Sequence, residues 1–400
     1  MTYFAERLRI PKITYITCVV TGLLGSAFAP SNASASELES YLSEIRAEYG
    51  LPAIAAAVVA DGKVVSAAAV GTRVLGQDLP VSIDDRFHLG SNTKSMTATL
   101  AGIMVDEGKL TWESRVGDIL GDLLPGMRAS LADATLEQLL SNSSGVPSDT
   151  DEIVDLYFSA DAFDYNPTEL RLNLIDRWKE NEIAVPEGSP FQYSNLGYII
   201  AGAMIEKVAE RPWELLINER IFAPLELGTA RLGAQATYGL IDAPVGHRIE
   251  QDGSATPMLW AASGDLPKVI GPAGNANMSI LDYAKWAGWN AGQGARGPAL
   301  VAPETLRHIQ TAKVQTPERP YPPPGTPSTG GYALGWGIVT FAWSDGPVLT
   351  HNGSNSMNLA RIVVDTERDL AVVVTTNFPG GRANAAAGEV MQNLYEAYAK

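Results

Sequence analysis

The segment that says most about the fold is Leu89-Gly-Ser-Asn-Thr-Lys-Ser-Met-Thr-Ala-Thr-Leu-Ala-Gly-Ile-Met-Val-Asp-Glu-Gly-Lys109. Leu100, Ile103 and Met104 recur with the period of a helix, which is typical of a helix with an apolar face. Gly108 supplies a stop signal after this pattern. The segment therefore predicts a short turn that leads into a helix.

Two side chains near the start of this expected helix could form a nucleophile. Ser91 lies at the helix entrance and Lys94 follows one turn later, on the same helix face. A serine hydroxyl needs a nearby base, and a lysine serves as one only where its surroundings lower its pKa. Free N–H groups at the helix start would favour negative charge there. The tetrapeptide alone is weak evidence, because a capping serine with a solvated lysine is the commoner arrangement.

Composition limits the kinds of protein this chain can be. It has 400 residues, 46% of them hydrophobic, and a formal net charge of −16. This length and apolar content indicate a globular chain with a large core. No basic stripe offsets the acidic charge, so a nucleic-acid partner is not expected.

The N-terminus has the pattern of a secretory signal. Basic residues up to Lys12 precede an apolar run over 13–29, and Ala33-Ser-Ala35 has the small-x-small form of a cleavage site. We expect residues 1–35 to be a signal peptide cleaved after Ala35, and the protein to be periplasmic or secreted. An uncleaved membrane anchor is the alternative, since the run is only marginally long enough to span a bilayer. No later segment of the sequence resembles a membrane span.

Metal and disulfide chemistry find little support in the sequence. Cys18, inside the apolar run, is the only cysteine, so the mature chain would hold neither a disulfide nor a thiol nucleophile. The four histidines are widely scattered and form no His-Glu-x-x-His motif. We expect no metal site and no cofactor.

Strand patterns occur at both ends of the chain. Asp61-Gly-Lys63 separates two apolar runs near the N-terminus, which predicts a hairpin. Expected strands cover 53–60, 64–70, 332–342, 348–350, 358–364 and 370–376. We therefore predict an α/β (α+β) fold with one antiparallel sheet built from both termini and flanked by helices. Its α/β part would cover about 36–108 and 330–400, and a mainly helical part would cover about 109–329.

Two further sites could contribute to the chemistry. Tyr193 and Asn195 come just before an apolar helix expected over 196–209. His351 lies at or near an expected strand, with Gly353 and Ser354 immediately after it. Taken singly, such a tyrosine is more often a packed aromatic and such a histidine a loop residue.

In this order, the motifs resemble those of the penicillin-recognising serine hydrolases. That family includes class C β-lactamases, D-Ala-D-Ala carboxypeptidases, D-aminopeptidases and related family VIII esterases. Ser91-Asn-Thr-Lys94 is similar to the first motif, Tyr193-Ser-Asn195 to the second and His351-Asn-Gly353 to the third. The stretches 139–147, 271–277 and 332–337 are similar to supporting segments, so the resemblance covers nearly all of the expected mature chain. It implies a β-lactamase/transpeptidase-like fold for the hydrolase domain, residues 36–400.

The resemblance also implies roles for the residues that match the motifs. Ser91 would attack a carbonyl and form an acyl-enzyme, while Lys94 and Tyr193 would transfer protons. The lysine charge would stabilise phenolate character at Tyr193. Asn195 would orient the substrate amide or the lysine.

The third motif would supply the rest of the substrate site. Backbone N–H groups of Ser91 and Ser354 would form the oxyanion hole. His351 and Gly353 would lie beside the polar end of the substrate. Dedicated β-lactamases usually have Lys-Thr-Gly in this motif, and a histidine is mostly neutral near pH 7. Efficient penicillin turnover is therefore not the leading expectation.

Three hypotheses remain for the reaction. The first is hydrolysis of peptide-like amides, such as D-amino-acid peptides, with β-lactams as further candidates. The second is a carboxylesterase on the same scaffold, and the third is a non-hydrolytic penicillin-binding or sensor protein. His351 as the base for Ser91 is a further alternative, although the sequence has no Gly-x-Ser-x-Gly elbow. The sequence does not predict the oligomeric state.

Overall fold

The computed structural model describes residues 35–160, 166–259, 265–322 and 326–400. Apart from Ala35, the expected signal peptide lies outside the described residues. Within those residues, no helix is both long enough and apolar enough to cross a membrane.

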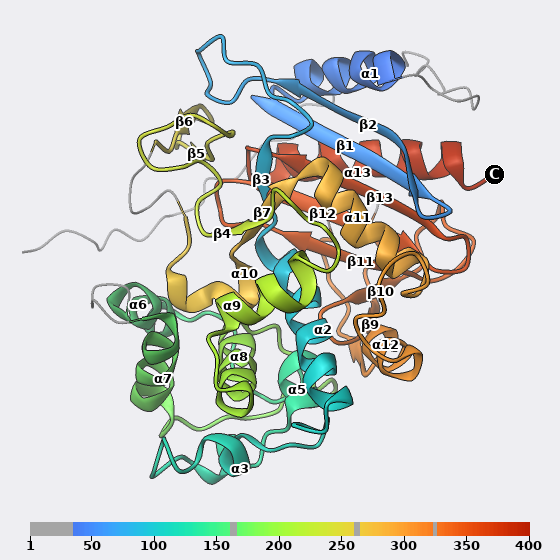
Figure 1. Ribbon diagram of the computed structural model, residues 1–400. Helices are drawn as coiled ribbons and strands as arrows, with labels where there is room; N and C mark the ends of the chain where they lie inside the picture. The colour runs from blue at the N-terminus through green and yellow to red at the C-terminus, as the bar shows by residue number, and fades with distance from the viewer. Residues whose placement is uncertain (1–34, 161–165, 260–264, 323–325) are drawn as a thin grey trace, which may run out of the picture.

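The central element is an eight-stranded antiparallel sheet in the order β2-β1-β13-β12-β11-β10-β9-β8 (Figure 1). Its strands are β1 (Ala53–Ala60), β2 (Lys63–Gly71), β8 (Val314–Thr316), β9 (Gly330–Tyr332), β10 (Gly337–Val339), β11 (Val348–Gly353), β12 (Leu359–Asp365) and β13 (Leu370–Thr376). The first strand pairs with β13 from the opposite end of the chain. The predicted sheet from both termini is therefore confirmed.

The β1–β2 hairpin has the turn that its sequence predicts. Asp61 and Gly62 both have positive φ, +49° and +71°. A two-residue turn with this geometry matches the twist of antiparallel strands, and Asp-Gly is one of the pairs that favour it. The Ala- and Val-rich strand β1 is buried along almost its whole length, so helices must cover both faces.

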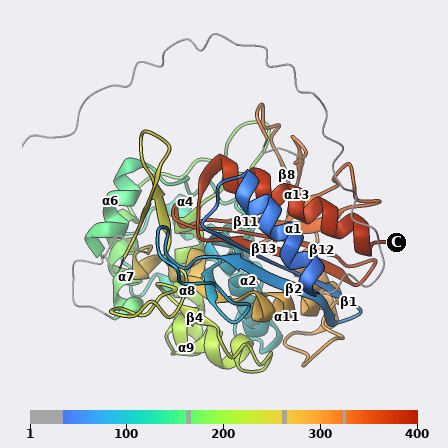
Figure 2. The same cartoon turned by 90° about the horizontal axis from the view of Figure 1, so that it is seen from above.

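Helices cover the sheet on both faces (Figures 1 and 2). On one face, α1 (Ala35–Glu48) and α13 (Gly380–Tyr398) lie next to each other and share a core with Ile54 and Val58 of β1. On the other face, α11 (Ile280–Ala291) packs against β1 and β13. Successive residues of β1 thus alternate between two cores, as expected for a strand buried on both faces.

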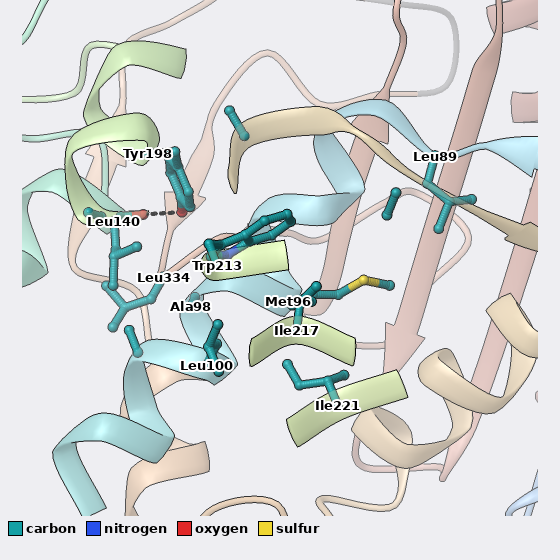
Figure 3. Packing of buried hydrophobic residues seen from close by; sticks show 14 of the residues in the cluster. Leu89, Met96, Ala98, Leu100, Leu140, Tyr198, Trp213, Ile217, Ile221 and Leu334 are labelled. Carbon is teal, nitrogen blue, oxygen red and sulfur yellow. Dashed lines mark hydrogen bonds between the residues drawn. The ribbon is translucent and has the colours of Figure 1, made fainter. Parts of the chain in front are cut away.

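The helical part packs against α2 (Thr93–Asp106), whose residues are buried on all sides from Thr93 to Met104. Figure 3 shows Met96 and Leu100 of α2 among side chains of α9 and of the π-helical segment η2. The remaining helices are η1 (Gly90–Asn92), α3 (Val116–Leu120), α4 (Ala129–Ala132), α5 (Leu136–Leu140), α6 (Asp151–Ala160), α7 (Pro167–Trp178), α8 (Asn195–Ala209), α9 (Trp213–Ile217), η2 (Asn218–Phe222), η4 (Lys268–Ile270), α10 (Gly271–Gly274) and α12 (Pro303–Gln310). Two minor sheets comprise β3 (Arg86–His88), β4 (Arg231–Leu232) and β7 (Ala276–Ser279), and β5 (His247–Ile249) and β6 (Ala255–Pro257).

The structure differs from the predicted elements in the last third of the chain. The single strand expected over 332–342 is wrong, because the chain folds back between β9 and β10. Gly335 in this turn has a φ of +75°, and a Cβ there would lie 2.6 Å from the carbonyl oxygen of Lys94. The close approach to α2 explains the glycine and the break in the strand. Within the interval 109–329, α11 lies on the sheet and β8 belongs to it.

Candidate active site

The turn that carries Ser91 and the end of β11 lie in close backbone contact. Ser91 lies in η1, directly before α2, and the end of β11 meets this turn. A Cβ added at Gly353 would lie 1.9 Å from the carbonyl oxygen of Leu89 and 2.9 Å from the backbone nitrogen of Ser91. A Cβ added at Gly90 would lie 2.4 Å from the backbone nitrogen of Ser354. Both glycines are needed so that the nitrogens of Ser91 and Ser354 can lie on adjoining backbones.

Lys94 is fully buried, and its amine has three hydrogen-bond acceptors. Nζ lies 3.2 Å from Ser91 Oγ, 2.6 Å from Asn195 Oδ1 and 2.8 Å from the Ala273 carbonyl oxygen. Burial lowers the pKa of Lys94 to about 7, while the negative charge of Asp149 acts in the opposite direction. A substantial fraction of this lysine is therefore neutral at pH 7 and able to accept a proton.

Tyr193 lies just before α8, and the Lys94 amine lies 4.8 Å from the centre of its ring. Burial raises the pKa of the Tyr193 phenol, and a hydrogen bond with Ser91 partly opposes this effect. The phenol is thus neutral at pH 7, whereas the resemblance implied phenolate character. Ser148 Oγ donates to the Tyr193 carbonyl oxygen at 2.6 Å and fixes the backbone at this position.

Asn195 connects Lys94 to a carboxylate that sequence reasoning missed. Its Oδ1 accepts from Lys94, and its Nδ2 donates to Asp149 Oδ2 at 2.7 Å. The other oxygen of Asp149 accepts from the Tyr157 hydroxyl at 2.9 Å. Asp149 lies two residues after the end of the 139–147 stretch, so its place in the sequence was the one available signal.

A second missed residue, Asn142, holds the segment that carries Tyr193. Its carbonyl oxygen accepts from the Gln192 N–H at 2.7 Å, and its Oδ1 accepts from the Ser194 N–H at 2.9 Å. Asn142 has a φ of +56°, a conformation that asparagine tolerates better than most residues. It belongs to the Leu139–Pro147 stretch that resembles a supporting segment of the family.

His351 lies in β11, with both ring nitrogens engaged. Nε2 lies 3.0 Å from the Tyr332 hydroxyl, and Nδ1 lies 2.9 Å from the Asn352 carbonyl oxygen. Because a carbonyl can only accept, Nδ1 carries the proton and Nε2 accepts from Tyr332. Burial, together with the charge of Lys94, lowers the pKa of His351 to about 3. His351 is therefore neutral, and neither ring nitrogen contacts Ser91 as a base would.

A cavity of about 260 Å³ opens beside the last residues of β11, and we call it the β11 cavity. Its walls include Phe191, Tyr193, Tyr332, His351, Asn352 and Arg361. Two of the predicted site residues, Tyr193 and His351, thus face a space that a substrate group could fill. Of the other predicted residues, Asn195 contacts Lys94, and Gly353 and Ser354 lie against the Ser91 turn. Among the described residues, no cluster of histidine, cysteine and acidic side chains is suited to hold a metal ion.

Comparisons with known proteins agree with this fold. A family model described as Beta-lactamase matches residues 38–395. The chain is 29% identical over 284 residues to the unguisins hydrolase ungD' of Aspergillus campestris (strain IBT 28561), a match that covers 67% of this chain and 49% of that protein. It is 25% identical over 358 residues to penicillin-binding protein 4 of Amycolatopsis lactamdurans, covering 88% and 86% of the two chains. The solved structure of the octameric penicillin-binding protein homologue from Pyrococcus abyssi matches with a TM-score of 0.72 and 25% identity, over 90% of this chain and 77% of that one.

These matches define the class of protein. Because the family model covers most of its length, the chain belongs to the Beta-lactamase family. It is a serine hydrolase of that family with a β-lactamase/transpeptidase-like fold. The predicted resemblance and fold class are confirmed. The chain spans about half the length of the Aspergillus campestris hydrolase.

Proposed function

We propose that this protein hydrolyses peptide-like amides, including D-amino-acid peptides, through an acyl-enzyme on Ser91. The observation that carries the proposal is the position of Lys94. Its amine lies 3.2 Å from Ser91 Oγ, and burial lowers its pKa to about 7. A serine with a neutral amine at hydrogen-bond distance has the base that nucleophilic catalysis needs.

The proposed reaction uses these groups in sequence. Ser91 Oγ attacks the carbonyl carbon and passes its proton to neutral Lys94. The resulting oxyanion accepts hydrogen bonds from the backbone N–H groups of Ser91 and Ser354, which the two glycines bring together. Tyr193 donates its proton to the leaving nitrogen and recovers one from the Lys94 ammonium. Water then cleaves the ester on Ser91, and the same groups transfer its proton.

The remaining site residues would position the substrate. Asn195 Oδ1 accepts a hydrogen bond from the Lys94 amine. The same side chain could also accept a hydrogen bond from the substrate amide or donate one to it. His351 and Gly353 form the β11 edge along which the substrate would lie. With a neutral His351 and no threonine in the third motif, β-lactams would be poorer substrates than peptide amides.

Carboxylester hydrolysis is the second candidate, and the state of His351 favours it. A neutral histidine adds no positive charge near the leaving group. An ester needs less protonation of its leaving group than an amide does. The same Ser91, Lys94 and Tyr193 would perform the reaction.

The test measures intact-protein mass and product release for the wild type, for Ser91→Ala and for the matched surface control Ser40→Ala. The probes are a fluorescent penicillin, an N-acetyl-D-alanyl-D-alanine peptide and p-nitrophenyl acetate. We expect turnover or a mass increase that needs Ser91 and persists in Ser40→Ala. Preference for the peptide supports the amidase, and preference for the acetate supports the esterase. A stable penicillin adduct without turnover of any probe supports a sensor, and activity in Ser91→Ala contradicts the proposal.

We also propose that residues 1–35 direct export and are removed after Ala35. The basic residues up to Lys12, the apolar run and the Ala33-Ser-Ala35 motif support this. Mass spectrometry of protein recovered from the periplasm or medium should show a chain that begins at Ser36. A chain that retains residues 1–35 would contradict it.

A further inference from the structure

His88 is a buried histidine at the end of β3, three residues before Ser91, and only 1% of its surface is exposed. Its Nδ1 accepts the N–H of Gly90 at 3.0 Å. An accepting ring nitrogen carries no proton, so the proton of this imidazole lies on Nε2. Nε2 lies 2.8 Å from Oδ1 of Asp265, whose side chain is only 12% exposed. The ring therefore joins the backbone of the Ser91 turn to a largely buried carboxylate.

The contact with Gly90 matters for the direction of the Ser91 N–H group. Gly90 has a φ of +52°, a left-handed conformation that glycine enters and leaves at little cost. The Gly90 carbonyl and the Ser91 N–H belong to one planar peptide group, so the Gly90 conformation sets where this N–H points. Thr93 Oγ1 donates to the Gly90 carbonyl oxygen at 2.7 Å. His88 and Thr93 thus hold Gly90 from both ends and fix the first donor of the expected oxyanion hole.

Asp265 also contacts the segment that carries Ser354, the second donor of the expected oxyanion hole. Asn355 Nδ2 donates to Asp265 Oδ1 at 3.4 Å, a long hydrogen bond. Asn355 Oδ1 in turn accepts from Asn358 Nδ2 at 2.9 Å. Ser354 Oγ donates to the Asn358 carbonyl oxygen at 2.6 Å. The same carboxylate is therefore connected to the backbones on both sides of the hole.

Gln235 closes these contacts into a ring of polar side chains. Its Oε1 accepts the His88 N–H at 2.5 Å, and its Nε2 donates to Asn358 Oδ1 at 3.0 Å. We call this set the β3 ring, and its members are His88, Gln235, Asp265, Asn355 and Asn358. They come from four separate parts of the chain, and a buried polar network of this kind rigidifies the segments that contribute to it.

We propose that the His88–Asp265 pair positions the two N–H donors of the oxyanion hole. The inference rests on the proposed acyl transfer at Ser91. His88 is a positioning residue, because it acts through the backbone of Gly90, and Asp265 acts through His88 and Asn355. A misaligned N–H group stabilises the developing oxyanion less well, so loss of the pair should slow acylation.

The test compares p-nitrophenyl acetate with O-(4-nitrophenyl) thionoacetate, in which sulfur replaces the carbonyl oxygen. Sulfur is a weak hydrogen-bond acceptor, so an aligned oxyanion hole favours the oxygen ester and a misaligned one loses that preference. The measured quantity is the oxygen-to-sulfur ratio of kcat/KM, with each value divided by the rate of alkaline hydrolysis of that ester. His88→Leu removes the acceptor for the Gly90 N–H, and we expect the ratio to fall roughly 10- to 100-fold.

Two further variants separate positioning from bulk and packing. His88→Asn is the conservative variant, because an asparagine side chain can accept the N–H two residues later in an Asx turn. It should keep most of the wild-type ratio. Asp265→Ala leaves the His88 ring in place without its carboxylate, and it should lower the ratio by a smaller factor than His88→Leu.

His247→Leu is the matched control for the loss of a buried histidine. His247 has no exposed surface, and its ring nitrogens contact the Leu75 N–H and the Asn377 carbonyl oxygen. The substitution should lower stability in urea unfolding while the oxygen-to-sulfur ratio stays at the wild-type value. An equal fall of the ratio in His247→Leu would overturn the inference, because the ratio would then follow stability alone.

A wild-type ratio in folded His88→Leu would overturn the inference while leaving the Ser91 chemistry intact. If His88→Leu does not fold, a wild-type ratio in Asp265→Ala would overturn it in the same way. No hydrolysis of p-nitrophenyl acetate by the wild type, or hydrolysis of both esters by Ser91→Ala, would contradict the proposed function itself, and the inference with it.

Discussion

Lys94 has no exposed surface, and its amine contacts Ser91, Asn195 and the Ala273 carbonyl oxygen. Desolvation disfavours the ammonium form, which is why the pKa falls to about 7. The neutral amine is the form that accepts the Ser91 proton. The rate of Ser91 acylation should therefore rise as pH increases through about 7.

Removal of the amine tests whether Lys94 or His351 is the base. Lys94→Ala should lower kcat/KM by roughly 100- to 10,000-fold, as expected for loss of a general base. Lys109→Ala, at an exposed lysine just beyond the same helix, should retain activity. Steady-state kinetics on p-nitrophenyl acetate measures both. Wild-type-like turnover in Lys94→Ala would contradict the assignment of Lys94 as the general base and would favour His351 in that role.

Asp149 acts on Lys94 through Asn195 and through its charge. The carboxylate raises the pKa of Lys94, so its removal in Asp149→Asn should lower that pKa further. The acidic limb of the pH–kcat/KM profile should then move to lower pH. Asp151→Asn, an equal charge change at an exposed position in α6, should leave the profile in place. An acidic limb that keeps its wild-type pH or moves to higher pH in Asp149→Asn would contradict this coupling.

Among the elements, the contact between β11 and η1 determines the geometry of the expected oxyanion hole. A Cβ at Gly353 would lie 1.9 Å from the Leu89 carbonyl oxygen, so Gly353→Ala must push the strand and the turn apart. We expect a loss of about 1–3 kcal/mol in the free energy of unfolding. We also expect a fall of roughly 100-fold in kcat/KM from misplaced backbone groups. Urea unfolding and kinetics measure the two effects.

Gly346→Ala is the control for this substitution. Gly346 lies in the turn before β11, and a Cβ there would meet no heavy atom within 4 Å. Its stability and activity should stay close to those of the wild type. If Gly353→Ala were equally silent, the close approach of β11 to η1 would have no functional role.

The buried ion pairs of Arg171 connect α7 to α8 and α9. Arg171 has no exposed surface and contacts Glu206 and Glu214. Arg171→Met would leave the buried Glu206 without its cation, which should cost about 3–5 kcal/mol of unfolding free energy. Arg115→Met removes an exposed pair with Asp133 and should cost under about 1 kcal/mol. Chemical denaturation of the two variants should show this contrast, and equal losses would contradict it.

At the scale of the whole molecule, local sequence signals predicted the sheet from both termini. The Asp61-Gly62 turn and the apolar runs on either side are contained in one short stretch, as are the runs of β12 and β13. The break at Gly335 was missed because its cause lies outside the stretch, where the turn meets the Lys94 carbonyl group. The role of Asp149 was missed for the same kind of reason. Its partner Asn195 is 46 residues away in the sequence.

The sequence predicted which residues form the candidate site, but it did not predict the protonation states of those residues. The motifs supplied the residues, and the structure brings Ser91, Lys94, Tyr193 and Asn195 together. Their catalytic roles stay predictions. The neutral states of Tyr193 and His351 depend on burial, which no short motif encodes.

The most direct test of the account is peptide mapping of protein quenched during reaction with p-nitrophenyl acetate. We expect an acetyl group on the peptide that contains Ser91, formed faster above pH 7 than below it, and lost as turnover proceeds. In Lys94→Ala the same peptide should be acetylated far more slowly. An acetyl group on another residue, or turnover without any acetylated peptide, would contradict the claim that Ser91, activated by Lys94, is the nucleophile.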